Sequence, residues 1–202
     1  MEQPPLFDLP PPLPPDLPEG LVYEPDFLEP AEAAELEALM ATLPFAAARY
    51  KTYTARRRVV SYGGSFDYDA NRLQPATALI AELHALRDRA ARWLGVPPQA
   101  FLHALAAEYP PGAPLGWHRD VSDFQDVVGI SLGSEIVMRF RPYPPDHPRK
   151  ADIVRLALAP RSIYLMRGPA RWAWQHSIAP ARALRWSITF RTASPRHRSG
   201  GA

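Results

Sequence analysis

The chain has no cysteine and no long apolar run. Without cysteine, disulfide bonds, zinc–thiolate sites and cysteine-ligated iron–sulfur clusters are excluded, although the redox compartment stays undetermined. No stretch approaches the roughly 18 apolar residues of a membrane-spanning helix, and no charged segment followed by an apolar core marks a secretion signal. The default expectation is a soluble, non-secreted, cytoplasmic protein with no membrane partner.

Lysine is scarce, since Lys51 and Lys150 are the only lysines in the chain. Net charge is just +2, and arginine carries almost all of the positive charge. Arginine binds phosphate in a bidentate fork and stacks on bases, which suits a nucleic-acid surface. A GC-rich genome also replaces lysine by arginine without functional reason. A modest net charge still permits a local basic stripe, and residues 56–58 (RRR) are the candidate.

The length of 202 residues suits one domain. Eight prolines fall within the first twenty residues, which excludes a helix or central strand there. We therefore expect an extended tail over residues 1–18, a domain over 19–195 and a flexible tail over 196–202. Nothing in the sequence requires more than a monomer.

The remaining pattern predicts two helices followed by many short strands. Apolar spacing favours helices over 31–43, after Pro30, and over 76–94, ended by Gly95. Breaks rich in proline and glycine then separate the expected strands. A first short strand is expected at 21–23, and those after the helices lie at 101–109, 116–120, 127–132, 136–141, 152–158, 162–166, 172–178 and 184–191. The predicted fold class is α+β, mainly β: a double-stranded β-helix (jelly-roll) core with two supporting N-terminal helices.

Within the strand-rich half, His118 and Asp120 stand two residues apart and His176 follows at a distance. Alternate residues of a strand point the same way, so one strand can supply two adjacent metal ligands. Two histidines and one carboxylate on one face of Fe(II) leave the opposite positions open for a co-substrate and O2. An isolated H-x-D is common by chance. Here, however, Arg185 and Arg191 follow His176, where an arginine could hold a carboxylate that reaches from the metal. The constellation predicts an iron-dependent oxygenase.

Several blocks of this half resemble the AlkB family of Fe(II)/2-oxoglutarate-dependent dioxygenases, in order and approximate spacing. They are residues 109–113 (YPPGA) with 117–120 (WHRD), 130–134 (ISLGS), 160–164 (PRSIY), 174–178 (WQHSI) and 185–191 (RWSITFR). The last block is similar to the family's R-x-N/S-x-T-F-R signature, and the likeness covers roughly residues 50–192. The resemblance implies that His118, Asp120 and His176 are the catalytic iron ligands, and that the cofactors are Fe(II), 2-oxoglutarate and O2.

The same resemblance implies a co-substrate pocket. Arg185 would pair with the far carboxylate of 2-oxoglutarate, because a planar guanidinium matches a carboxylate. Arg191 would help hold the keto-acid end, and Tyr109 would donate its hydroxyl. Ser187 and Thr189 lie between the two arginines on the same inward face and would line the pocket. The alternative for Arg185 and Arg191 is that they lie on a solvated edge strand, and the alternative for Tyr109 is that it is packed in the core.

Residues 56–69 (RRRVVSYGGSFDYD) resemble the family's nucleotide-recognition lid, expected near 50–70. Arg57 suits a phosphate. Tyr62, Phe66 and Tyr68 offer faces on which an extruded base could stack. An ordinary aromatic hairpin would look similar.

Two positions depart from the family pattern. Ser122 stands where many nucleic-acid-repairing members carry an acidic residue that reads the flipped base. Ala107 replaces an asparagine that contacts 2-oxoglutarate. Neither change touches the iron ligands.

Taken together, the resemblance implies oxidative demethylation of N-alkylated bases in DNA or RNA, releasing formaldehyde, succinate and CO2, with alkylated nucleic acid as the partner. Ser122 favours an alternative in which the same chemistry acts on tRNA nucleosides or a protein side chain. A third reading, from a different class, is a non-catalytic binding module.

Overall fold

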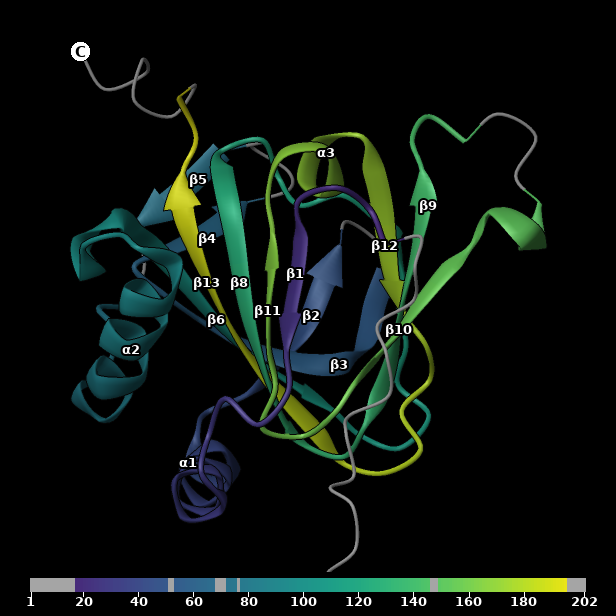
Figure 1. Ribbon diagram of the computed structural model, residues 1–202. Helices are drawn as coiled ribbons and strands as arrows, with labels where there is room; N and C mark the ends of the chain where they lie inside the picture. The colour runs from purple at the N-terminus through teal and green to yellow at the C-terminus, as the bar shows by residue number, and fades with distance from the viewer. Residues whose placement is uncertain (1–16, 51–52, 68–71, 76, 146–148, 196–202) are drawn as a thin grey trace, which may run out of the picture.

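The computed structural model describes residues 17–50, 53–67, 72–75, 77–145 and 149–195. Two antiparallel β-sheets lie face to face in it (Figure 1). The large sheet has the strand order β1-β11-β8-β13-β6-β3-β2, and the small sheet has the order β10-β9-β12-β7. Strands β4 and β5 form a separate ribbon. This is the jelly-roll architecture that the sequence predicted.

The large sheet consists of β1 (Leu21–Glu24), β2 (Ala46–Tyr50), β3 (Tyr53–Tyr62), β6 (Phe101–Tyr109), β8 (Phe124–Gly133), β11 (Ile163–Met166) and β13 (Arg185–Ala193). The small sheet consists of β7 (Leu115–His118), β9 (Ile136–Pro142), β10 (Val154–Leu158) and β12 (Trp174–Ile178). The ribbon pairs β4 (Gly64–Asp67) with β5 (Arg72–Pro75). The helices are α1 (Pro30–Thr42), α2 (His84–Leu94) and α3 (Gly168–Trp172), with 3-10 turns η1 (Ala81–Leu83), η2 (Pro98–Ala100) and η3 (Lys150–Asp152).

Helices α1 and α2 lie on the outer side of the large sheet (Figure 1). α1 begins at Pro30, whose fixed φ and missing N–H suit the first helical position. α2 ends at Gly95, which has a φ of 77°, the left-handed conformation that glycine adopts without strain. Along the described ranges, no helix is long and apolar enough to cross a membrane.

Strand alternation gives the large sheet two different faces. On β13, Ile188 and Phe190 belong to the core that packs under the helices. Arg185, Thr189 and Arg191 on the same strand line a cavity between the sheets. A side-chain period of two therefore separates the stabilising residues of β13 from its chemically active ones.

The second predicted helix is shorter than expected. Residues 77–80 are not helical, and Ile80 is extended with φ −65° and ψ 149°. Leu79 and Ile80 nevertheless pack against the helix-side core. The apolar positions that suggested extra helical turns are therefore satisfied by an extended segment, and the regular helix begins at His84.

Other boundaries differ as well. Strands β3 and β4 lie at residues 53–62 and 64–67, within the region that was expected to form a recognition lid. The predicted strand 172–178 begins at Trp174, because α3 occupies the residues before it. Most of the predicted proline-rich tail, residues 1–16, lies outside the described residues, as does the 196–202 tail. Leu17 packs against the core between the sheets.

Candidate active site

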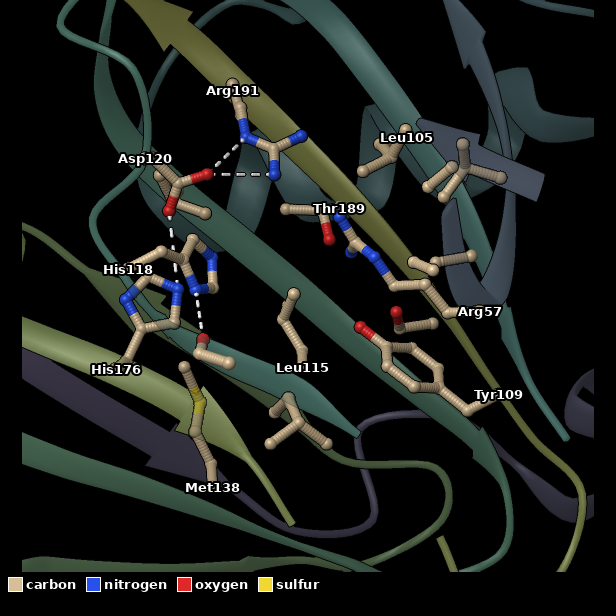
Figure 2. A pocket seen from close by; sticks show the side chains of 18 of the residues that line it. Arg57, Leu105, Tyr109, Leu115, His118, Asp120, Met138, His176, Thr189 and Arg191 are labelled. Carbon is tan, nitrogen blue, oxygen red and sulfur yellow. Dashed lines mark hydrogen bonds and ion pairs between the residues drawn. The ribbon is translucent and has the colours of Figure 1, made fainter. Parts of the chain in front are cut away.

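Three side chains converge between the sheets, as the H-x-D…H spacing predicted (Figure 2). His118 ends β7 and His176 lies on β12, and the two residues are directly paired across the strands. Their ring centroids are 4.2 Å apart. With Asp120 they offer ligand atoms that all lie within 4.8 Å of one another. Two imidazoles and one carboxylate form a donor set that fits Fe(II).

Asp120 reaches this position differently from the prediction, because β7 stops at His118 and the carboxylate follows in a turn. Strand alternation therefore does not orient it. Instead, Arg191 donates from Nε and a terminal nitrogen to Oδ1, at 3.0 and 2.9 Å. Oδ2 stays 3.5 Å from Nε2 of His176. Arg171 holds the turn by donating to the carbonyls of Val121 and Phe124, at 2.5 and 2.9 Å.

The protonation states of the three side chains suit a cation. Burial on its own would raise the pKa of Asp120, but Arg191 and its other positive neighbours outweigh it and hold that pKa well below its usual range. Burial lowers the pKa of His118, and it lowers the pKa of His176 to about 3. At neutral pH the carboxylate is charged and both imidazoles are neutral, the states that bind a metal.

The tautomer of His118 is fixed by its backbone. Its Nδ1 lies 2.9 Å from the carbonyl oxygen of Gly116, so Nδ1 carries the proton and donates it. The lone pair is then on Nε2. A second partner of this kind is what orients metal-binding histidines in general.

A second group of side chains gathers around Tyr109, deeper along β6. The guanidinium of Arg185 lies 4.9 Å from the centre of the tyrosine ring, and its Nε donates to Oγ of Ser131 at 3.3 Å. Arg57 reaches into the cavity from β3 (Figure 2), and both arginines act on the tyrosine hydroxyl. Burial would raise the pKa of Tyr109, but the two arginines outweigh burial and lower it. Arg185 is only 1% exposed.

The three candidate metal ligands, Arg191 and the group formed by Tyr109, Arg57 and Arg185 line one cavity of about 840 Å³. Its lining, among the described residues, includes four arginines (Arg57, Arg119, Arg185 and Arg191) and a single carboxylate, that of Asp120. Buried charges are stable only when they are paired. Arg185, which is 1% exposed and lies in the same cavity as the candidate metal ligands, therefore fits a carboxylate of a dianion such as 2-oxoglutarate.

The remaining predicted co-substrate residues also face the cavity. Ser187 and Thr189 are buried and line it from β13. Ala107, where the family carries asparagine, lines it opposite Ser187 and contributes only a methyl group. His103 was missed by the sequence analysis, although it lies an even number of residues before Tyr109 on β6. The alternation of that strand was sufficient to place it in the cavity.

Several of the predicted substrate-binding residues do not line the cavity. Tyr62 is 4% exposed and belongs to the helix-side core, so the expectation that it offers a stacking face in the site is wrong. Ser122 is exposed in the turn after Asp120 and does not line the cavity; Val121 does. The side chain of Phe66 and the whole of Tyr68 lie outside the described residues.

The expected basic stripe at residues 56–58 is divided between two faces of β3. Arg57 points into the cavity and is 7% exposed, too deep for a phosphate on the surface. Arg56 and Arg58 point the other way, and Arg58 pairs with Glu108 at 3.0 Å. A run of three like residues on a strand always splits in this manner, so the stripe is not continuous.

Comparison with known proteins agrees with this geometry. The model of the 2OG-Fe(II) oxygenase superfamily matches residues 20–191. The tRNA (carboxymethyluridine(34)-5-O)-methyltransferase alkbh8 of Xenopus tropicalis is 32% identical over 180 residues, which are 84% of this chain. The chain is an AlkB-family member of this superfamily. The AlkB-family protein is thus an enzyme, a dioxygenase that uses Fe(II), 2-oxoglutarate and O2.

The DNA oxidative demethylase ALKBH2 of Bos taurus is 29% identical to this AlkB-family enzyme, over 72% of the chain. The chain spans 27% of the frog protein's length and 56% of the bovine protein's. The solved structure of OsALKBH1 superposes with a TM-score of 0.67 at 14% identity, covering 86% of this chain and 96% of that one. At that identity the superposition shows a shared fold.

Proposed function

We propose that this oxygenase removes N-alkyl groups from bases of DNA or RNA by oxidation, releasing formaldehyde, succinate and CO2. One observation carries the proposal: a single cavity holds the three candidate metal ligands together with the buried guanidinium group of Arg185. The nucleic-acid part is supported by two relatives, one named as a DNA oxidative demethylase and one as a tRNA methyltransferase.

His118, Asp120 and His176 are the residues that we propose to hold Fe(II). Bound there, the iron would supply the activation of O2 that is coupled to decarboxylation of 2-oxoglutarate. Asp120 contributes a permanent negative charge, because Arg191 keeps its carboxyl ionised. Burial keeps both imidazoles unprotonated, so no proton has to leave before the metal binds.

For 2-oxoglutarate, we propose that Arg185 pairs with the far carboxylate while Tyr109 donates its hydroxyl. Arg57 joins them as a further cation, because it acts on the same hydroxyl from β3, the strand that pairs with β6. It brings hydrogen-bond donors to the part of the cavity where Ala107 offers none. Arg191 would face the keto-acid end, and Ser187 and Thr189 would line the space between.

The same chemistry on a tRNA nucleoside is the second candidate. Bases such as 1-methyladenine and 3-methylcytosine are cationic, so they benefit from a nearby carboxylate. Asp120 is the sole carboxylate among the described lining residues, and it is already paired with Arg191. A neutral modified nucleoside needs no such partner, and this favours the tRNA substrate.

The test is release of formaldehyde and succinate in the presence of Fe(II), ascorbate and 2-oxoglutarate. Single-stranded oligonucleotides that carry 1-methyladenine or 3-methylcytosine are compared with unmodified ones and with total tRNA, and His118→Ala serves as the control. Formaldehyde that depends on the methylated base and vanishes in the variant supports the first candidate. Turnover stimulated by tRNA alone supports the second. Succinate without either response would contradict both substrates.

A further inference from the structure

The outer face of the small sheet is rich in arginine. β9 places Arg139 and Arg141 on it and β10 places Arg155, while the residues between them on each strand are buried. Arg119 follows the end of β7 and is exposed. The four strands of this sheet contain no aspartate or glutamate. We call these four arginines, together with Trp117, the arginine face.

The arginine face has a cost for folding. Arg155 is paired directly across the strands with Arg139. Like charges at directly opposed positions of a sheet are destabilising. Within the described ranges, none of the four arginines forms an ion pair with a carboxylate of the chain. Among the described residues, no carboxylate therefore compensates this repulsion, whereas an external polyanion would.

The guanidinium groups are also held in place. Nε of Arg139 donates to Oγ of Ser177 at 3.0 Å, and Nε of Arg141 donates to Oε1 of Gln175 at 2.9 Å. Both groups lie over the ring of Trp117, at 5.4 and 4.5 Å from its centre. These contacts use Nε and the guanidinium plane, so the terminal nitrogens remain for a ligand. Preordered, planar donors of this kind match phosphate oxygens.

The arginine face continues to the edge of the active-site cavity. Trp117 immediately precedes His118, and both Trp117 and Arg119 border the cavity. Arg119 lies 3.7 Å from the ring centre of Tyr143, which is 39% exposed, and donates to the carbonyl of Trp172 at 3.0 Å. Helices α1 and α2 lie on the other side of the molecule, so they leave this face uncovered (Figure 1).

We propose that the arginine face binds the phosphodiester backbone of the nucleic-acid substrate, on the nucleotides that flank the base in the cavity. The inference rests on the proposed function, since it extends the path of the same strand. Charge complementarity selects the occupant: the face is purely cationic and its donors have the planar geometry that phosphate accepts. Backbone contacts of this kind position a strand without reading its sequence.

The experiment measures binding of a fluorescent 20-nucleotide single-stranded RNA by anisotropy at several salt concentrations. The test variant is Arg139→Gln with Arg141→Gln. The matched control is Arg87→Gln with Arg92→Gln on α2, which removes the same charge from the opposite side of the molecule. Thermal unfolding followed by circular dichroism checks that both variants fold.

We expect the test variant to bind about tenfold more weakly, with a slope of log affinity against log salt that is smaller by about 1.4, the value for two phosphate contacts with a single strand. The α2 control should retain the wild-type slope. Equal weakening of both variants would overturn the inference, as would absence of RNA binding by the wild type. Displacement of RNA by poly-glutamate as readily as by unlabelled RNA would overturn it in favour of an acidic protein partner.

The formaldehyde assay separates this inference from the proposed function. If the wild type releases formaldehyde but the arginine-face variant binds RNA like the wild type, only the inference fails. If binding depends on the arginine face while no formaldehyde is released from any substrate, only the proposed function fails.

Discussion

Inside the cavity, two nitrogens of Arg191 donate to the same oxygen of Asp120, at 3.0 and 2.9 Å. The other carboxylate oxygen of Asp120 is left facing the two histidines. A third nitrogen of Arg191 lies 3.1 Å from Nδ1 of His103. The arginine thus orients the one candidate iron ligand that no strand orients.

Replacing Arg191 by Gln should therefore weaken metal binding by roughly 10- to 100-fold, the range found when a residue behind a metal ligand is lost. Titration with Mn(II), a redox-stable substitute for Fe(II), measures the affinity. Thr189→Val is the matched control, since Thr189 lies on the same strand and lines the same cavity. Wild-type affinity in the Arg191 variant would show that the turn alone orients Asp120.

Metal removal should lower the stability of the whole domain. The candidate ligands come from β7, the turn after it and β12, so an ion bound by all three ties these segments together in the folded state only. Mn(II) at a hundred times its dissociation constant should add about 2.7 kcal/mol to the free energy of unfolding. A chelator should reverse the gain, and His176→Ala should show none. Urea unfolding with and without metal measures it; an equal gain in the variant would place the metal elsewhere.

Arg185→Gln should raise the KM for 2-oxoglutarate by about tenfold or more with a smaller effect on kcat, since a charge-assisted bond to a carboxylate is worth about 1.5–3 kcal/mol. Succinate release at increasing 2-oxoglutarate concentrations gives both constants. Ser187→Ala, a nearby inward residue without charge, is the comparison. An unchanged KM in the arginine variant would remove Arg185 from the co-substrate site.

Acid should destabilise the protein through His103. Burial first, and then Arg191, lower the pKa of this histidine to about 3, whereas in the unfolded chain it is about 6.5. Between these values only the unfolded state binds the proton. The stability is therefore fully present above pH 6.5 and is lost as the pH falls toward 3. At pH 5 this one group costs about 2 kcal/mol.

His103→Asn tests the acid effect, because an amide oxygen can still accept the hydrogen bond from Arg191. The loss of unfolding free energy between pH 7.5 and pH 5, measured with urea on the metal-free protein, should shrink by about 2 kcal/mol. His84→Asn, on an exposed histidine of α2, is the control. If both variants lose as much as the wild type, the buried histidine is not the group responsible.

The part of the site that lies on regular strands could be predicted from the sequence. The alternation of Arg185, Ser187, Thr189 and Arg191 places all four in the cavity because β13 is an unbroken strand across them. Asp120 was assigned to a strand as well, but β7 ends two residues earlier. Its orientation depends on Arg191, a contact across 71 residues of sequence that no local pattern contains.

In the lid region, strand β3 was not predicted from the sequence. Residues that lie on its two opposite faces were therefore assigned to one site. Arg57 and Tyr62 are five residues apart on β3, an odd separation, so they must point to opposite faces of the sheet. Both were assigned to substrate binding, yet Arg57 lies in the cavity and Tyr62 under the helices. Three consecutive arginines do not indicate which of them is buried. The long-range pairing of β3 with β6 decides that.

Gly129 offers a prediction about the back wall of the cavity. It lies on β8 directly opposite Tyr164 of β11, and a Cβ atom added to it would stand 2.2 Å from the tyrosine ring. Gly129→Ala should therefore displace Tyr164 and destabilise the protein by about 1–3 kcal/mol, the usual cost of overpacking. In a Tyr164→Ala background the same change should cost much less, because the ring is gone. Urea unfolding of the wild type, the two single variants and the double variant completes this double-mutant cycle. An equal cost of Gly129→Ala with and without the tyrosine ring would show that the ring is not what requires glycine.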